Sequence, residues 1–218
     1  PIQNDNKIVE DIADTYPTES LIMVLTLTKN GYFPKHLLHQ EHLDLTGVSH
    51  AFVESKHYPA FVEAISDLTG KTFVVTGTTS GTGRIAALTL AQKGGRVLML
   101  NRPSSRSEGV QRDMCETFTE GQVSTIECDL QSFASVRAAS QQLRELCAES
   151  GIYALINNAG IMAMPDEATE DGFDTQMQVN HLSHFLLTAE VFSLLEKAAE
   201  LHGDARIVNH SSMARLGV

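Results

Sequence analysis

The sequence is short of positive charge. Its 218 residues include 16 lysines and arginines against 27 aspartates and glutamates, which gives a formal net charge of −11 at pH 7. A nucleic-acid-binding surface needs clustered cations, and anionic lipid headgroups repel an acidic protein. The charge balance therefore argues against a nucleic-acid partner and against a membrane surface.

Cysteine and long apolar runs are also scarce. The three cysteines, Cys115, Cys128 and Cys147, are odd in number and fit no zinc-ligand spacing, which argues against a disulfide framework. The longest largely apolar run, residues 21–27, is far too short to cross a bilayer. No signal-peptide pattern opens the chain. We therefore expect a soluble intracellular protein without a transmembrane segment, in a reducing compartment such as the cytoplasm or an organelle stroma or matrix.

Histidine spacing raises the question of a metal site. His36, His39 and His42 recur every three residues, with Glu41 and Asp44 nearby. No H-E-x-x-H pattern is present, and solvent-exposed or helix-capping roles suit these histidines better. We predict that the chain has no metal site.

From residue 71 onward, apolar runs alternate regularly with helical stretches. Strand-like runs occupy 72–76, 96–101, 123–128, 153–157 and 206–210, and helix-like segments occupy 82–93, 108–119, 132–149 and 171–201. This alternation predicts βαβ units and a parallel sheet. Ser132 is the expected N-cap of the third helix. The predicted fold class is α/β, a doubly wound parallel-sheet Rossmann fold.

Residues 1–70 lack this alternation. The length allows one large domain or one domain with an appendage, so we assign residues 1–70 to an N-terminal extension and residues 71–218 to the Rossmann domain. Residues 21–27 fit either a strand or a buried helix. The sequence leaves open whether the extension packs on the domain or docks a protein partner, and whether the chain forms a homo-oligomer.

The last predicted helix carries an apolar stripe. Spacings of three and four residues place Leu182, Phe185, Leu186, Ala189 and Phe192 on one face. Phe173 and Met177 share a face earlier in the same segment. This pattern predicts a helix that largely faces the core, and a surface for a protein partner is also possible.

A glycine-rich turn connects the first strand of the Rossmann domain to its first helix. Glycines let the backbone turn sharply and approach a pyrophosphate, and the helix N-terminus offers free N–H groups. The spacing is G-x-x-x-G-x-G, at the strand-to-helix junction that a dinucleotide site requires. The cofactor-binding residues predicted here are Gly77, Thr79, Ser80, Gly81, Thr82 and Gly83.

The end of the second strand indicates which dinucleotide is bound. An acidic residue there would bind the ribose 2′-hydroxyl of NAD. The sequence has Asn101 and Arg102 instead, and a guanidinium binds phosphate well. Ser104, Ser105 and Arg106 follow and could assist. We therefore predict that the cofactor is NADP(H), bound in part by Asn101 and Arg102.

These features resemble the short-chain dehydrogenase/reductase family, and the resemblance runs from residue 71 to the C-terminus. Further motifs follow in the family's order: Cys-Asp-Leu at 128–130, Asn-Asn-Ala-Gly at 157–160, Val-Asn-His-Leu-Ser-His-Phe at 179–185 and Ile-Val-Asn-His-Ser-Ser at 207–212. Their residues are most similar to the retinol-dehydrogenase-like and protochlorophyllide-reductase-like branches.

The resemblance implies roles for individual residues. Asp129 would contact the adenine amino group, and residues 157–160 would support the sheet and line the cofactor. Two residues would be catalytic: Ser212 would hydrogen-bond the substrate carbonyl, and Asn180 would hold a water in the proton relay. The cofactor-binding residues implied by these motifs are Asp129, Leu130, Asn158, Ala159 and Gly160.

The family's general acid/base is the tyrosine of a Tyr-x-x-x-Lys motif, and none of the four tyrosines here is followed by lysine at that spacing. Three readings remain open: part of a longer NADP(H)-dependent oxidoreductase acting on a carbonyl or alcohol, a chain completed by a second polypeptide, or a non-catalytic, cofactor-binding accessory subunit. A Rossmann-type methyltransferase is a further alternative, against which residues 157–160 and Asn180 argue. We expect negligible reductase activity from residues 1–218 alone.

Overall fold

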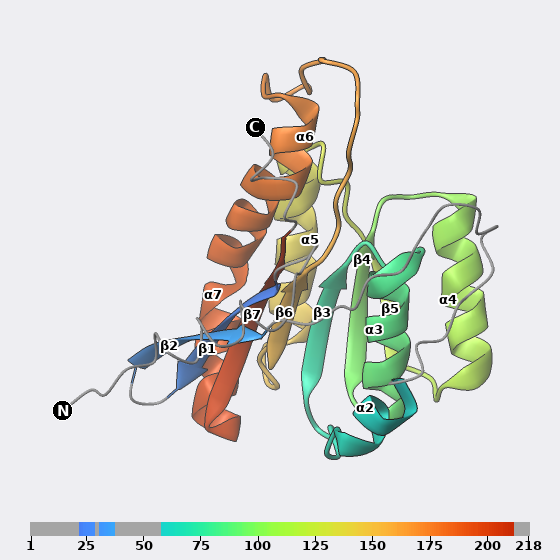
Figure 1. Ribbon diagram of the computed structural model, residues 1–218, viewed down its shortest axis with the longest axis vertical. Helices are drawn as coiled ribbons and strands as arrows, with labels where there is room; N and C mark the ends of the chain where they lie inside the picture. The colour runs from blue at the N-terminus through green and yellow to red at the C-terminus, as the bar shows by residue number, and fades with distance from the viewer. Residues whose placement is uncertain (1–21, 29–30, 38–57, 212–218) are drawn as a thin grey trace, which may run out of the picture.

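The computed structural model describes residues 22–28, 31–37 and 58–211, which form a seven-stranded sheet in the order β2-β1-β7-β6-β3-β4-β5 (Figure 1). The five strands β3 to β7 are parallel to one another, and the β1–β2 hairpin adds to the β7 edge through an antiparallel β1–β7 pair. The parallel part confirms the predicted doubly wound α/β fold. The strands are β1 Ile22–Thr28, β2 Gly31–Leu37, β3 Thr72–Thr76, β4 Arg96–Asn101, β5 Val123–Glu127, β6 Ala154–Asn157 and β7 Asp204–His210.

Helices cover both faces of the parallel sheet (Figure 1). On one face α3 and α4 pack against the central strands, and on the other face α5 packs beside α7. The helices are α2 Tyr58–Ala64, α3 Gly81–Gln92, α4 Ser105–Thr117, α5 Phe133–Leu146, α6 Thr175–Met177 and α7 Ser183–His202, with a π-helical turn η1 at Gln178–Leu182.

The alternation of side chains along a strand divides the core into two layers. In β3, Val74 packs with the cluster that includes α5 and α7, whereas Val75 packs with the cluster that includes α3 and α4. Both side chains are fully buried. Because successive residues of a strand point to opposite faces, a strand buried on both sides reads as a continuous apolar run.

Side-chain caps explain where two of the helices begin. The Ser132 hydroxyl accepts a hydrogen bond from the Ser135 amide at 3.3 Å, so the predicted N-cap of the third helix is confirmed. Ser104 caps α4 in the same way through the Ser107 amide, at 3.1 Å. This cap starts the helix at residue 105 rather than at the predicted residue 108.

The last helix begins later than the sequence suggests. Asp174 is its N-cap and accepts a hydrogen bond from the Met177 amide at 2.7 Å, so the helix begins at residue 175 rather than 171. Gly172 has a φ of +83°, a left-handed conformation that cannot continue a right-handed helix. The first helical residues then pass through the π-helical turn before α7 begins.

The predicted apolar stripe on this helix is wrong for two of its members. Phe185 is 70% exposed, and Ala189 is exposed as well. The buried face carries Leu187, Val191 and Leu195 instead. This second set follows equally good helical spacing, so periodicity alone does not distinguish the two faces.

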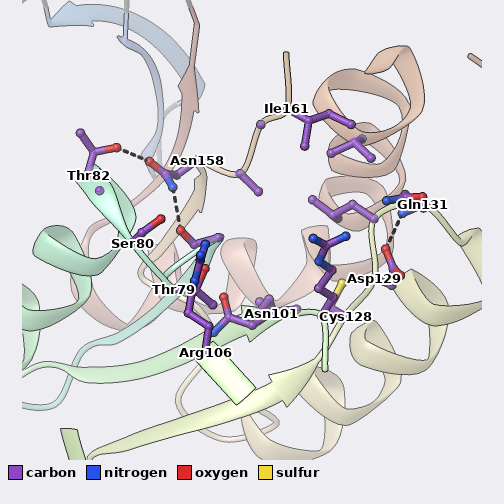
Figure 2. A pocket seen from close by; sticks show the side chains of 18 residues that line it. Thr79, Ser80, Thr82, Asn101, Arg106, Cys128, Asp129, Gln131, Asn158 and Ile161 are labelled. Atoms are coloured by element: carbon purple, nitrogen blue, oxygen red, sulfur yellow. Dashed lines mark hydrogen bonds between the residues drawn. The ribbon is translucent and has the colours of Figure 1, made fainter. Parts of the chain in front are cut away.

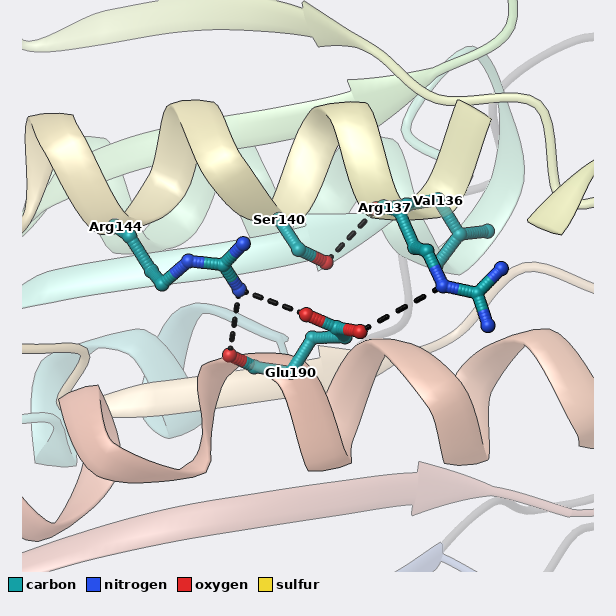
Figure 3. A network of polar contacts seen from close by, with 5 residues as sticks. All are labelled: Val136, Arg137, Ser140, Arg144 and Glu190. Atoms are coloured by element: carbon teal, nitrogen blue, oxygen red, sulfur yellow. Dashed lines mark hydrogen bonds and ion pairs between the residues drawn. The ribbon is translucent and has the colours of Figure 1, made fainter. Parts of the chain in front are cut away.

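An ion-pair network joins α5 to α7 on the protein surface (Figure 3). Arg144 Nη1 donates hydrogen bonds to the Glu190 carbonyl oxygen at 3.0 Å and to its Oε2 at 2.9 Å. Arg137 Nε lies 3.8 Å from the other carboxylate oxygen, Oε1. Glu190 thus contacts two residues of α5, Arg137 and Arg144, that are seven positions apart in the sequence.

Part of the predicted N-terminal extension packs on the Rossmann domain. The Tyr58 hydroxyl and Thr89 Oγ1 of α3 are 2.6 Å apart, and Leu68 belongs to a buried cluster with Phe73 and Tyr153. Of the two readings for residues 21–27, the structure has the strand. The boundary at residue 70 stays a prediction. Within the part of the chain that the structure describes, no helix has the length and apolar character needed to cross a bilayer.

Candidate functional site

A cavity of about 390 Å³ lies where the carboxyl ends of the central strands meet. The connections after β3 and β6 leave in opposite directions along the sheet, which is the position where doubly wound sheets bind ligands. Of the predicted cofactor-binding residues, Gly83 alone does not line the cavity. The predicted residues that line it are Gly77, Thr79, Ser80, Gly81, Thr82, Asn101, Arg102, Asp129, Leu130, Asn158, Ala159 and Gly160.

The segment from the end of β3 into the first turn of α3 is packed too closely for side chains at two of its glycines. A Cβ on Gly77, whose φ is +70°, would lie 2.8 Å from the Ala159 Cα. A Cβ on Gly83 would lie 2.3 Å from the Gly77 carbonyl oxygen and 2.4 Å from Asn158 Nδ2. Gly83 therefore allows α3 to pack against the turn behind the cavity, although it does not line the cavity itself.

Asn101 holds this turn from the end of β4. Its Oδ1 accepts from the Thr78 amide at 2.9 Å, and its Nδ2 donates to the Thr78 hydroxyl at 2.8 Å. Both residues are buried. Asn101 thus lines the cavity and also fixes the backbone of the glycine-rich turn.

Asn158 ties the opposite wall of the cavity to the same turn (Figure 2). Its Nδ2 donates to the Thr76 carbonyl at 3.0 Å and to the Gly77 carbonyl at 3.3 Å. Its Oδ1 accepts from the Thr82 hydroxyl at 2.9 Å and lies 3.2 Å from His210 Nδ1. One amide side chain therefore connects β3, the start of α3 and the end of β7.

The neighbouring Asn157 supports the sheet, as the family resemblance implies. Its Nδ2 donates to Asn209 Oδ1 in β7 at 2.8 Å and to the Thr188 hydroxyl in α7 at 3.2 Å. These bonds connect β6 to the strand that leads towards residue 212.

The charged groups of the cavity lie at its β4–β5 side. Arg102 and Arg106 both line it and are exposed, so their guanidinium groups are available to an anion. Asp129 supplies the carboxylate, and its Oδ1 accepts from the Gln131 amide at 2.9 Å (Figure 2). The Ser104 hydroxyl, predicted as a possible aid to the arginines, is engaged as the N-cap of α4.

Cys128 lines the cavity, but its thiol is expected to react slowly. Its side chain is buried, and burial raises the pKa of the thiol to about 12, with the Asp129 charge acting in the same direction. A thiol with this pKa is almost entirely protonated at neutral pH and is a poor nucleophile.

The two predicted catalytic residues have different outcomes. Asn180 lies in the π-helical turn, where its Oδ1 accepts from the Ile161 amide and its Nδ2 donates to the Ile161 carbonyl, both at 2.8 Å. Ile161 lines the cavity, so Asn180 holds the cavity wall rather than forming part of it. Ser212 lies outside the described residues.

Leu100, Gln131, Ile161 and Val179 also line the cavity and are not among the predicted residues. Gln131 and Ile161 directly follow predicted positions, and Leu100 and Val179 directly precede them. Predicted segments one residue longer at each end would include all four. Among the described residues, no group of three or more histidine, cysteine, aspartate or glutamate side chains could hold a metal ion. His39 and His42 lie outside the described residues.

Comparisons with known proteins agree with the geometry of this site. A family model described as short chain dehydrogenase matches residues 71–217. Retinol dehydrogenases 13 and 11 from Homo sapiens are 38% and 42% identical to this chain over 147 residues, which are 67% of the chain. The chain spans less than half of their length, 43% and 44%.

A solved structure, the RhlG/NADP active-site complex of Pseudomonas aeruginosa, is 29% identical and superposes with a TM-score of 0.50, covering 61% of this chain and 50% of that one. The family model covers most of the chain, and the relatives share its sequence over the same segment. The chain therefore belongs to the short-chain dehydrogenase/reductase family, within which it is similar to the retinol dehydrogenases.

Proposed function

We propose that this chain forms the NADP(H)-binding part of an oxidoreductase that interconverts a carbonyl and an alcohol. The observation that carries the proposal is the cavity in which the glycine-rich turn, the wall at residues 158–160 and two arginines meet. The cavity has the glycines that a pyrophosphate requires and the cations that a 2′-phosphate requires, so its residues fit this cofactor.

Each part of the cavity suits one part of the cofactor. The turn at residues 77–81 and the N-terminus of α3 offer backbone N–H groups to the pyrophosphate. Asp129 would accept from the adenine amino group. Arg102 and Arg106 would hold the 2′-phosphate, and Asn101 beside them brings no negative charge to repel it.

The nicotinamide, when bound, supplies or accepts the hydride. The chain's own residues would position the reactants and manage the proton. Asn180 is held by its two hydrogen bonds to Ile161 and would hold a water of the proton relay. Ser212 would donate a hydrogen bond to the substrate oxygen and so stabilise the charge that develops there.

Isothermal titration of the protein with NADPH and with NADH tests the cofactor assignment. We expect tighter binding of NADPH, and we expect Arg102→Glu to weaken NADPH binding more than tenfold, because losing a charge-assisted phosphate contact costs about 1.5–3 kcal/mol. Binding of NADH should change little. Arg112→Glu is the matched control, because Arg112 is exposed on α4 and does not line the cavity. Unchanged NADPH affinity in Arg102→Glu would reject the role of Arg102.

The compartment is a further part of the proposal. Cys115, Cys128 and Cys147 are all free thiols, which supports a reducing compartment, either the cytoplasm or an organelle stroma or matrix. Fractionation of source cells with an antibody to the chain tests this, and recovery from a secreted fraction would contradict it.

A further inference from the structure

The hydroxyl of Thr76 is the centre of a hydrogen-bond chain behind the cavity. Thr76 ends β3 and is fully buried. Its Oγ1 accepts from the backbone amides of Asn158 at 3.0 Å and Ala159 at 2.9 Å. A hydroxyl has two lone pairs and one proton. Both acceptor positions are therefore occupied, and only the proton is left to donate.

The geometry gives that proton one good acceptor. His184 Nε2 lies 2.9 Å from Thr76 Oγ1, whereas the Ile156 carbonyl is 3.5 Å away. The Thr76 hydroxyl therefore donates to His184 Nε2, and this nitrogen carries no hydrogen. In a neutral imidazole the hydrogen is then on Nδ1, which lies 3.3 Å from the Asn180 carbonyl oxygen.

The ring is neutral at physiological pH. His184 is 5% exposed, and burial lowers its pKa to about 4, against a smaller raising by the hydrogen bond to the Asn180 backbone and with a minor lowering from nearby His181. The tautomer is thus set by its two partners, one on β3 and one in the π-helical turn.

These bonds connect Thr76 and Asn180, the two residues that anchor one wall of the cavity. The wall consists of residues 158–161, of which all four line the cavity. Thr76 holds its first two residues through their amides, and Asn180 holds Ile161 through two hydrogen bonds. His184 lies one helical turn after Asn180 and contacts both anchors, Thr76 and Asn180.

We propose that His184, as its Nδ1–H tautomer, is a positioning residue that locks the Thr76 and Asn180 anchors together and so fixes the 158–161 wall in its binding shape. The opposite tautomer would donate to Thr76 Oγ1 and displace one of the two amides. An apolar side chain would leave the Thr76 proton without its closer acceptor. The expected effect of this wall on cofactor binding rests on the proposed function. The His184 tautomer and the rigidity of residues 158–161 do not depend on it.

Long-range ¹H–¹⁵N NMR of the imidazole groups in the unmodified protein tests the tautomer directly. We expect His184 to show a protonated Nδ1 and an unprotonated Nε2 at pH 7. Thr76→Val should shift the Nε2 resonance towards the value of a nitrogen that accepts no hydrogen bond, and Thr76→Ser should not. A protonated Nε2 would overturn the proposal.

Amide hydrogen exchange and cofactor titration of His184→Leu test its consequence. We expect faster exchange at residues 158, 159 and 161 with no change at Val97 in the central β4, and about tenfold weaker NADPH binding. His184→Gln, whose amide offers both an acceptor and a donor, should partly restore slow exchange at the wall and NADPH affinity. Uniformly faster exchange, or unaltered exchange at the wall, would mean that His184 only fills space and would overturn the proposal. If the unmodified protein binds no NADPH, the proposed function fails, and the NMR and exchange results still decide the role of His184.

Discussion

At the scale of single residues, close backbone packing limits what the glycine-rich turn accepts. Gly83→Ala would place a methyl group 2.3 Å from the Gly77 carbonyl oxygen and 2.4 Å from Asn158 Nδ2. We expect it to destabilise the fold by about 1–3 kcal/mol, as overpacked sites do, and to weaken NADPH binding. Urea unfolding and cofactor titration measure the two effects.

Gly109→Ala in α4 is the matched control for this substitution. A Cβ at residue 109 meets no atom within 4 Å, and alanine is favoured over glycine in helices by about 1 kcal/mol. This variant should therefore be as stable as the parent or more so. Equal effects of the two alanines would contradict the packing argument.

Acid should weaken the fold through the buried His184 and the half-buried His210. The pKa of His184 is lowered to about 4 by burial, and that of His210 is also lowered by burial. Between pH 6.5 and 4 the unfolded chain binds protons that the folded chain does not, so stability falls as the pH decreases. For His184 the loss is about 1.5 kcal/mol between pH 6.5 and pH 5. Urea titrations at the two pH values should show a smaller difference in His184→Gln than in the parent; an equal difference would contradict this assignment.

The three thiols should differ in reactivity. Cys115 is exposed, whereas Cys128 and Cys147 are buried and burial raises the pKa of both. Iodoacetamide at pH 7.5 should therefore label the native protein at Cys115, and all three thiols after unfolding. Peptide mass spectrometry identifies the labelled sites, and rapid native labelling of Cys128 would show that the cavity opens more than the structure indicates.

At the scale of elements, the link between α5 and α7 should contribute little to stability. The Arg137, Arg144 and Glu190 side chains are partly exposed, and ion pairs of this kind contribute about 0–1 kcal/mol. We expect Arg144→Gln to lower the free energy of unfolding more than Arg137→Gln, because the first pair is 2.9 Å apart and the second 3.8 Å. Added salt should reduce both effects. A larger loss from Arg137→Gln would contradict the geometry.

The sequence predicts elements well where local signals agree and poorly where two signals compete. The strands β3 and β4 are easy to predict because a strand buried on both faces is a nearly continuous apolar run, as at residues 72–76. The predicted start of the last helix is four residues too early, because the helical spacing of Phe173 and Met177 includes Phe173, whereas left-handed Gly172 and the N-cap Asp174 place the start at residue 175. The π-helical turn has no periodic signature of its own.

The candidate site was predicted in part for a similar reason. Residues of the glycine-rich turn are recognised by a local motif, and the structure brings them together with residues 158–160. The role of Thr76 and His184 depends on a contact between residues 108 positions apart. Such a long-range contact is set by the topology of the sheet, so it cannot be predicted from the spacing of residues along the chain.

At the scale of the whole molecule, the described tyrosine nearest in sequence to the cavity wall lies at the wrong end of the sheet for proton transfer. The Tyr153 amide donates to the Thr72 carbonyl, at the start of β3, while the cavity is at the opposite end of these strands. Tyr153 is also 4% exposed. We therefore expect residues 1–218 alone to bind NADPH without measurable reduction of carbonyl substrates.

Steady-state assays that follow NADPH absorbance test this expectation. They use a panel of aldehydes and ketones and are run alongside the binding titration. Binding without turnover agrees with it, and is also how an accessory subunit would behave. Steady turnover by this polypeptide would contradict it, and would require a proton donor other than Tyr153.

The seven-stranded sheet has a consequence for contacts between molecules. Its two outer strands are β5 and β2, and an outer strand with free donors and acceptors can recruit a strand from another chain. Pro34, paired in register with Leu25, interrupts the row of N–H groups along β2. We expect this missing donor to make β2 a poorer edge for a strand of another chain to pair with.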